Sequence, residues 1–353
     1  MKEGSPKYWM ISKRNDGGIG TGVSQHLTYW INKEGANGEI GDISNWTNVT
    51  SHGKDRGKTF KSLLAASVDQ FPTFGHENHE RQSHVTLFIH GYNESFYKSA
   101  TLYGMICEKL FGVSSPENEK LGGFCVLYDW PSMGHLPFYL PDRSHARQCA
   151  EPLADVLGDL FDYLLKKQRI AAIDPSKACK AKVSVIAHSM GNYVLQKALA
   201  VAWTRKNQPL LVTLVNQLVM VAADVDNDIF DAGSSDNVDG SAMINLTYRI
   251  TSLFSGRDAV LGDSAGLKHF GTRRLGRSGL ASRPPLNITL PRTDNVWDID
   301  CSSFFPNSIG SKDIHGAYFD NDTVIDLMIK LLRGIDRNIL SIPGHTKSNA
   351  WPQ

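Results

Sequence analysis

The stretch Val183-Ser184-Val185-Ile186-Ala187-His188-Ser189-Met190-Gly191-Asn192 decides the fold of this chain. Its first half has the apolar, β-branched character of a strand that is buried on both faces. An abrupt turn follows at residues 188–191, and apolar residues then recur at helical spacing over 193–202. A strand, a sharp turn with a serine at its apex and a helix form the pattern of a nucleophile elbow.

Small residues on either side of the serine support this interpretation. The strained backbone of an elbow needs them two positions before and two positions after the nucleophile. Ala187 and Gly191 occupy these positions, which gives the motif Ala-x-Ser-x-Gly. The alternative is a buried strand that enters a helix through an N-capping serine. The rest of the chain has to distinguish the two.

Composition and charge narrow the class of protein. The 353 residues are enough for one large α/β domain or two small ones. Because 37 Lys and Arg nearly balance 36 Asp and Glu, the net charge points neither to nucleic acid nor to an anionic membrane. No apolar run approaches the ~20 residues that span a bilayer, and the N-terminus lacks the apolar region of a signal peptide. Five scattered cysteines favour reduced thiols. We therefore expect a cytoplasmic protein.

Strands and helices alternate along most of the chain. Apolar runs predict strands at 85–89, 124–130, 183–187, 218–224, 248–254 and 295–300. Amphipathic helices are predicted between them, including one that begins near Glu151-Pro152 or earlier, and another follows the last strand over 323–332. This alternation predicts an α/β fold, with a mostly parallel central sheet and helices on both faces.

The pattern divides the chain into three parts. Residues 1–83 are expected to form an N-terminal extension packed on the core as an edge hairpin and a partial cover over the site, with strands at 8–12 and 26–30 and a helix over 58–70. Residues 84–333 form the α/β domain, and 334–353 a poorly ordered tail. His76, His79 and His84 lie close together, but their polar neighbours favour a solvated connector over a metal site.

Chemistry-bearing residues lie in the segments that follow predicted strands, where ligands gather in parallel sheets. They are the loop 90–92, Ser189, Asp258 and His315. A serine hydroxyl needs an adjacent base to act as a nucleophile, and the base needs an orienting carboxylate. The order Ser189, Asp258, His315 is the one expected of an α/β-hydrolase.

Two aspartates compete for the role of the orienting acid. Asp224 ends the strand after the elbow helix, and some α/β-hydrolases draw their acid from that place. Asp258 ends the next strand, the more usual place, after a tight turn at 255–257. We favour Asp258, and Asp224 stays open. The oxyanion of the reaction intermediate would be held by the backbone amides of Met190 and Tyr92.

Several short segments around these positions occur in a characteristic order: 88–93, 130–132 with Tyr139 and Asp142-Arg143, 187–192, 223–226, 255–258, 274–276 and 315–319. In these segments the chain resembles a family of α/β-hydrolases long catalogued only as a bacterial domain of unknown function and predicted to be serine esterases. The resemblance covers roughly residues 84–333.

The resemblance implies an α/β-hydrolase fold and a Ser-Asp-His triad. The expected activity is hydrolysis of a small-molecule or lipid-like carboxylic ester through an acyl-enzyme on Ser189, with no cofactor, no metal and no nucleic-acid partner. A lipase, an amidase or an acyltransferase would use the same triad. A catalytically silent α/β-hydrolase that serves as a binding module is the alternative from another class.

Other residues near the expected site have more modest interpretations. The apolar loop 133–140 either forms the acyl pocket or its lid, or packs beneath the neighbouring helix. Asp142 is interpreted as a helix N-cap, and His188 as a structural side chain. A cluster of arginines either binds an anionic substrate group or forms ion pairs at the surface: Arg273, Arg274 and Arg277.

Overall fold

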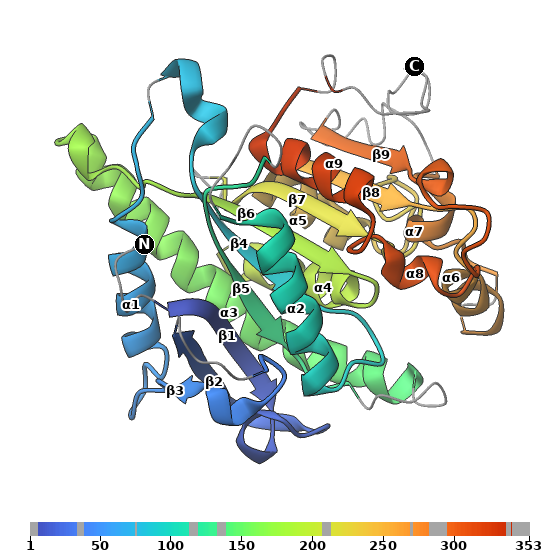
Figure 1. Cartoon of the computed structure of the whole chain (residues 1–353), viewed down its shortest axis with the longest axis horizontal. Helices are drawn as coiled ribbons and strands as arrows, with labels where there is room; N and C mark the ends of the chain where they lie inside the picture. The colour runs from blue at the N-terminus through green and yellow to red at the C-terminus, as the bar shows by residue number, and fades with distance from the viewer. Residues whose placement is uncertain are drawn as a thin grey trace.

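The computed structural model describes residues 6–33, 39–74, 76–112, 119–132, 139–206, 213–268, 271–281, 295–336 and 340. These residues form a nine-stranded sheet in the order β3-β2-β1-β5-β4-β6-β7-β8-β9 (Figure 1). The strands are β1 (Pro6–Arg14), β2 (Val23–Lys33), β3 (Thr47–Asn48), β4 (His84–Ile89), β5 (Gly123–Asp129), β6 (Lys182–His188), β7 (Val215–Val221), β8 (Thr247–Phe254) and β9 (Val296–Asp300). The helices are α1 (Lys58–Val68), α2 (Phe96–Leu110), α3 (Tyr139–Ala171), α4 (Gly191–Lys206), α5 (Asn237–Leu246), α6 (Ala259–Asp263), α7 (Leu275–Ser278), α8 (Ile314–Ala317) and α9 (Asp322–Arg333).

Seven of these strands run parallel to one another. From β1 through β5, β4, β6, β7 and β8 to β9, each neighbouring pair is parallel. The hairpin partner β2 and the short β3 add an antiparallel edge. The predicted strands at 8–12 and 26–30 are thus present as β1 and β2, and β1 joins the N-terminal extension to the main sheet through β5.

Apolar side chains fill both faces of the sheet. One core lies beneath α1, α3, α4 and α5, and it includes Val185 and Ala187 of β6. The other core lies beneath α2 and α9, and it includes Ile186 of the same strand. Because successive side chains of a strand point to opposite faces, this alternation explains why β6 reads as a continuous apolar run.

Helix α9 shows how local sequence sets the ends of an element. The side chain of Asn321 caps its first turn by accepting a hydrogen bond from the backbone N–H of Val324, at 3.2 Å. Gly334 ends the helix with a φ of 80°, a left-handed conformation that glycine adopts without steric cost. Of the tail predicted to follow, all but residues 334–336 and 340 lie outside the described part of the chain.

Two local predictions near α3 and β7 need correction. Asp142 is not an N-cap, because α3 already begins at Tyr139 and Asp142 lies within its first turn. Pro141 is tolerated there, since the N–H that proline lacks has no partner in a first turn. The strand predicted to reach Asp224 ends at Val221, where Ala222 turns the chain with a φ of 43°. Residues 133–138 of the apolar loop lie outside the described residues.

His84 lies directly beyond the polar connector predicted between His76 and His84. It is fully buried as the first residue of β4, which lies between β5 and β6. Its Nδ1 is 2.8 Å from Ser184 Oγ, and burial lowers its pKa to about 3. Among the described residues, no three His, Cys, Asp or Glu side chains are grouped to hold a metal ion. No helix in the same part of the chain is long and apolar enough to span a membrane.

Candidate active site

Ser189 stands at the apex of the turn between β6 and α4. Its φ of 51° lies in the left-handed region, as the strained backbone of an elbow requires. The turn is held by two backbone hydrogen bonds, from Ser189 N–H to Val221 O at 3.0 Å and from Asp224 N–H to Ser189 O at 3.1 Å. A Cβ on Gly191 would lie 2.4 Å from His90 O, so only glycine fits at this crossing of helix and strand.

Three side chains form a continuous hydrogen-bonded chain at this turn. His315 Nε2 is 2.8 Å from Ser189 Oγ, and His315 Nδ1 is 2.7 Å from Asp258 Oδ2. Asp258 is fully buried, whereas the side chain of His315 is 15% exposed. Because a carboxylate only accepts, Nδ1 carries the proton, and the lone pair of Nε2 faces the serine hydroxyl.

Local structure fixes Asp258 at the end of β8. Its second carboxylate oxygen accepts the backbone N–H of Leu261 at 3.0 Å and so caps α6. Its backbone carbonyl oxygen accepts a hydrogen bond from Arg277. The aspartate is thereby held by both its side chain and its backbone, with one oxygen left for His315.

His188, directly before the serine, holds the segment that carries His315. Its Nε2–H donates to the backbone carbonyl oxygen of His315 at 2.9 Å. The ring of His188 also packs edge-on against Phe319, with 5.3 Å between centroids. Burial and the nearby His315 lower the pKa of His188 to about 3, so it is neutral at neutral pH. These contacts make it a positioning residue rather than a second base.

Asp224 is occupied by a separate buried network. One carboxylate oxygen accepts from Tyr139 Oη at 2.8 Å, and the other accepts from Ser264 Oγ and Arg274 Nε, both at 2.8 Å. Arg274 is fully buried and also pairs with Asp226. Burial alone would raise the pKa of Asp224, but Arg274 and the Tyr139 hydroxyl hold it at about 2. It is therefore Asp258, and not Asp224, that contacts the His315 ring.

The loop 90–92 lies against Ser189 from the β4 side. A Cβ on Gly91 would lie 2.9 Å from the Cβ of Ser189, so the loop backbone passes directly beside the serine. The ring of His90 stacks on Trp130 at a centroid distance of 5.3 Å, and Trp130 Nε1–H donates to His90 O at 2.8 Å. The ring of Tyr92 packs edge-on against Tyr139 at 5.6 Å.

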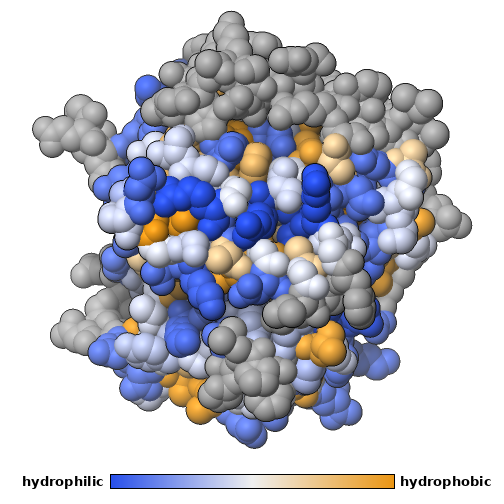
Figure 2. All heavy atoms as spheres, turned by 90° about the vertical axis from the view of Figure 1, so that its right-hand side faces the viewer, coloured by the Kyte–Doolittle hydropathy of each residue, from blue (hydrophilic) through white to orange (hydrophobic). Residues whose placement is uncertain are grey.

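The side of the molecule toward which the parallel strands point is largely polar in its coloured part (Figure 2). The carboxyl ends of the parallel strands point toward the right-hand side of Figure 1, which faces the viewer in Figure 2. Hydrophilic side chains dominate the coloured part of this face, and apolar ones form smaller patches between them. Ser189 itself is only 4% exposed.

Known proteins agree with this architecture. Residues 72–299 match the family described as alpha/beta hydrolase of unknown function (DUF900), well over half of the chain. The chain belongs to this family. A relative in Nostoc sp., the uncharacterized protein alr1448, is 29% identical over 133 residues, which are 33% of this chain and 31% of that protein. The match therefore spans about a third of that relative.

Solved structures give a weaker likeness. An esterase from Pyrobaculum calidifontis is 11% identical, with a TM-score of 0.31 over 78% of this chain and 90% of its own. A predicted CIB-like hydrolase from Thermoplasma acidophilum is 13% identical, with a TM-score of 0.30 over 72% and 88%. TM-scores this low carry no argument, and the α/β-hydrolase fold rests on the family match and the sheet topology.

This DUF900 protein also has contacts near the site that the sequence did not predict. Arg14, from the end of β1, pairs with the buried Asp129 at 2.8 Å and donates to Glu94 O at 2.9 Å. Burial alone would raise the pKa of Asp129, but Arg14 and His90 hold it below its ordinary value. Ser132 donates to Asp142 at 2.6 Å and accepts from Asn93 N–H at 2.8 Å. These side chains brace the loop that follows β4.

The Arg274 network makes a prediction about stability. Arg274→Met leaves Asp224 buried without its cation, so we expect the free energy of unfolding to fall by about 3–5 kcal/mol at pH 7. Urea denaturation followed by circular dichroism measures this loss. The control is Arg273→Met, because Arg273 is exposed and its replacement should change stability by less than about 0.5 kcal/mol. Equal losses in both variants would contradict a stabilising role for the buried pair.

Proposed function

We propose that this α/β-hydrolase is a serine hydrolase that cleaves a carboxylic ester through an acyl-enzyme on Ser189. The observation that carries the proposal is the hydrogen-bonded chain from Ser189 Oγ through the His315 ring to Asp258. In such a chain the imidazole removes the serine proton as the hydroxyl oxygen attacks the ester carbonyl. The carboxylate keeps the imidazole in the productive tautomer and stabilises the imidazolium that forms.

The first half of the reaction then transfers the acyl group. Ser189 Oγ bonds to the carbonyl carbon, and the tetrahedral intermediate carries a negative oxygen. We assign its hydrogen-bond donors to the backbone amides of Met190 and Tyr92. The intermediate collapses, the ester C–O bond breaks, and His315 Nε2 donates its proton to the departing alcohol. The close passage of Gly91 beside Ser189 supports the assignment of Tyr92, its neighbour.

The second half regenerates the enzyme. His315 removes a proton from a water molecule, which attacks the acyl carbon. The resulting intermediate expels Ser189, which recovers its proton from the imidazolium, and the carboxylic acid leaves. In both halves Asp258 is the carboxylate that orients His315. Both oxygens of Asp224 are engaged by Tyr139, Ser264 and Arg274.

We also assign roles to two parts of the chain from these contacts. Residues 84–333 contain the proposed triad and oxyanion donors. Residues 1–83 contribute β1, β2 and β3, and Arg14 of β1 supports the segment after the loop 90–92 by donating to Glu94 O. A small-molecule or lipid-like ester is the proposed substrate.

A chain-length series of p-nitrophenyl esters, from acetate to dodecanoate, tests the proposed activity. We expect turnover of at least one ester that saturates with substrate and is lost in Ser189→Ala. A p-nitroanilide of the same acyl chain should be cleaved far more slowly, because its leaving group departs less readily. Absence of turnover across the series would favour a silent binding module, and faster cleavage of the anilide would favour an amidase.

A further inference from the structure

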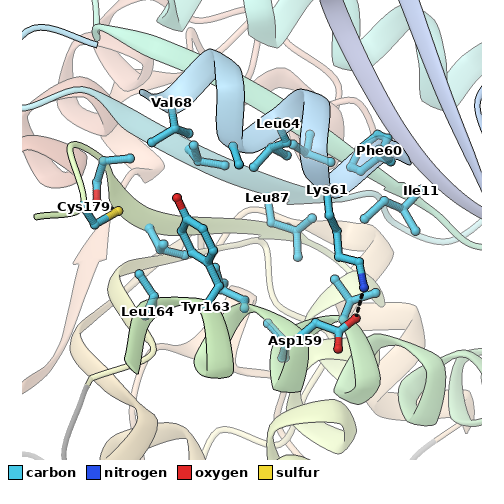
Figure 3. Close-up of a pocket in the computed structure, with 18 of the residues that line it drawn as sticks. Ile11, Phe60, Lys61, Leu64, Val68, Leu87, Asp159, Tyr163, Leu164 and Cys179 are labelled. Atoms are coloured by element: carbon cyan, nitrogen blue, oxygen red, sulfur yellow. Dashed lines mark hydrogen bonds and ion pairs between the residues drawn. The ribbon is translucent and has the colours of Figure 1, made fainter. Parts of the chain in front are cut away.

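An apolar pocket lies between α1 and α3, against the face of the sheet that these helices cover (Figure 3). Its volume is about 170 Å³. In Figure 3, Phe60, Leu64 and Val68 of α1 project into it from one side, and Tyr163 and Leu164 of α3 lie on the other. Ile11 and Leu87 of the sheet lie between the two helices. We refer to it as the α1–α3 pocket.

The α1–α3 pocket leaves part of a central strand uncovered. Val85 and Leu87 of β4 line it and are only half-buried, although β4 lies between β5 and β6. The inner strands of a parallel sheet are normally covered on both faces, and protein interiors rarely contain voids larger than a water molecule. An apolar void over inner strands loses contacts that an apolar occupant would restore.

The pocket ends before the proposed active site. Leu87 of β4, Val126 of β5 and Val185 of β6 line the pocket. The residues two positions further along these strands, on the same face of the sheet, are Ile89, Tyr128 and Ala187. All three are fully buried in the core beneath α3 and α4. A layer of packed side chains therefore separates the pocket from the carboxyl ends of the strands, where Ser189 stands.

The charges at one end of the pocket restrict its occupant. Lys61 Nζ is 2.7 Å from Asp55 and 3.1 Å from Asp159, so two carboxylates share one ammonium. Figure 3 shows the contact with Asp159. Burial alone would lower the pKa of Lys61, but both aspartates hold it above its ordinary value. A carboxylate ligand would have to compete with two carboxylates already present. These groups are roughly half exposed, so an added cation would gain little from them.

We propose that the α1–α3 pocket binds an uncharged single-chain amphiphile, such as an aliphatic alcohol, with its alkyl chain between α1 and α3. The volume resembles the ~150 Å³ of an apolar cavity that stays dry and binds benzene. Since the pocket is open at the surface, the head group stays in water beside Lys61. The bound alkyl chain would contact both α1 of the N-terminal extension and α3 of the α/β domain.

Calorimetric titration of the full chain with 1-butanol, 1-hexanol and 1-octanol tests this proposal. We expect saturable binding with an affinity that rises about fourfold for each added methylene. Octanoate and octylammonium should bind no better than 1-octanol. Tighter binding of either ion, or no saturable binding of any alcohol, would overturn the proposal.

Two alanines of α1 provide a matched pair of variants that locate the binding. Ala65 lines the pocket, and Ala66 is exposed on the same helix. Methionine has nearly the helix propensity of alanine, so Ala65→Met should fill the pocket without breaking α1. We expect this variant to lose at least about tenfold in affinity for 1-octanol, and Ala66→Met to bind as the native protein does.

Three further measurements separate the pocket from other sites. Ester turnover by Ala65→Met should equal that of Ala66→Met, because the pocket is closed off from Ser189. Modification of Ser189 by a fluorophosphonate should leave octanol binding unchanged; its loss would place the alcohol in the active site and overturn the proposal. The sedimentation coefficient of the native chain could instead rise with protein concentration, and this rise could be absent in Ala65→Met. That result would make a second copy of the chain the occupant and overturn the proposal.

Discussion

Replacing Ser189 with alanine is expected to lower kcat for a p-nitrophenyl ester on the order of 10⁶-fold. The elbow turn is held by backbone hydrogen bonds, so the variant should keep its fold and its melting temperature. His315→Ala should lose about as much activity, since nucleophile and base act as a unit. The double variant should then be no slower than either single variant.

Initial-rate measurements on the three variants, with circular dichroism beside them, test this expectation. His26→Ala is a suitable control, because His26 is exposed on β2 and its replacement should leave kcat unchanged. If Ser189→Ala kept more than a few per cent of native turnover, another nucleophile would carry the reaction. If the two single losses multiplied in the double variant, Ser189 and His315 would act independently.

Replacing Asp258 with asparagine is expected to lower kcat about 10⁴-fold. Asparagine can still accept the N–H of Leu261, which caps α6, so the fold should persist. However, the amide group facing His315 donates rather than accepts. The imidazole then carries its proton on Nε2, where it can no longer accept from Ser189.

Asp224→Asn is the matched comparison for Asp258→Asn. The carboxylate of Asp224 accepts hydrogen bonds from the side chains of Tyr139, Ser264 and Arg274. Neither Ser189 nor His315 is among these partners. We expect this variant to lose thermal stability and much less of its kcat. The opposite pattern, a stable but inactive Asp224→Asn beside an active Asp258→Asn, would contradict the assignment of the acid.

The sequence predicts the fold well because the strands carry its strongest signals. Buried parallel strands read as continuous apolar runs, so their ends can be located from the sequence. Ser189 and Asp258 follow such ends and His315 lies in the segment after the last strand, and the structure brings all three together. Ser189 and Ala222 adopt left-handed backbone conformations and are held by hydrogen bonds to adjacent strands, which local residue preferences do not reveal. The turn at Ala222 explains why β7 ends earlier than its apolar run.

Side-chain networks between distant segments were beyond the reach of the sequence. The choice between Asp224 and Asp258 depends on Arg274, which follows Asp224 by 50 residues. Arg14 lies 115 residues before Asp129, in the extension whose role was least clear. The buried ring of His84 contacts Ser184, 100 residues further along the chain. In each case partners far along the chain, rather than local pattern, decide the residue's environment.

The most direct test of the proposed function is covalent labelling with a fluorophosphonate, read by intact mass and peptide mapping. An activated serine displaces fluoride and keeps the phosphonyl group on its oxygen. The proposal predicts one adduct per native chain, on Ser189, no adduct in Ser189→Ala, and greatly slowed labelling in His315→Ala. A native chain that stays unmodified, or that carries the label on a different residue, would contradict it.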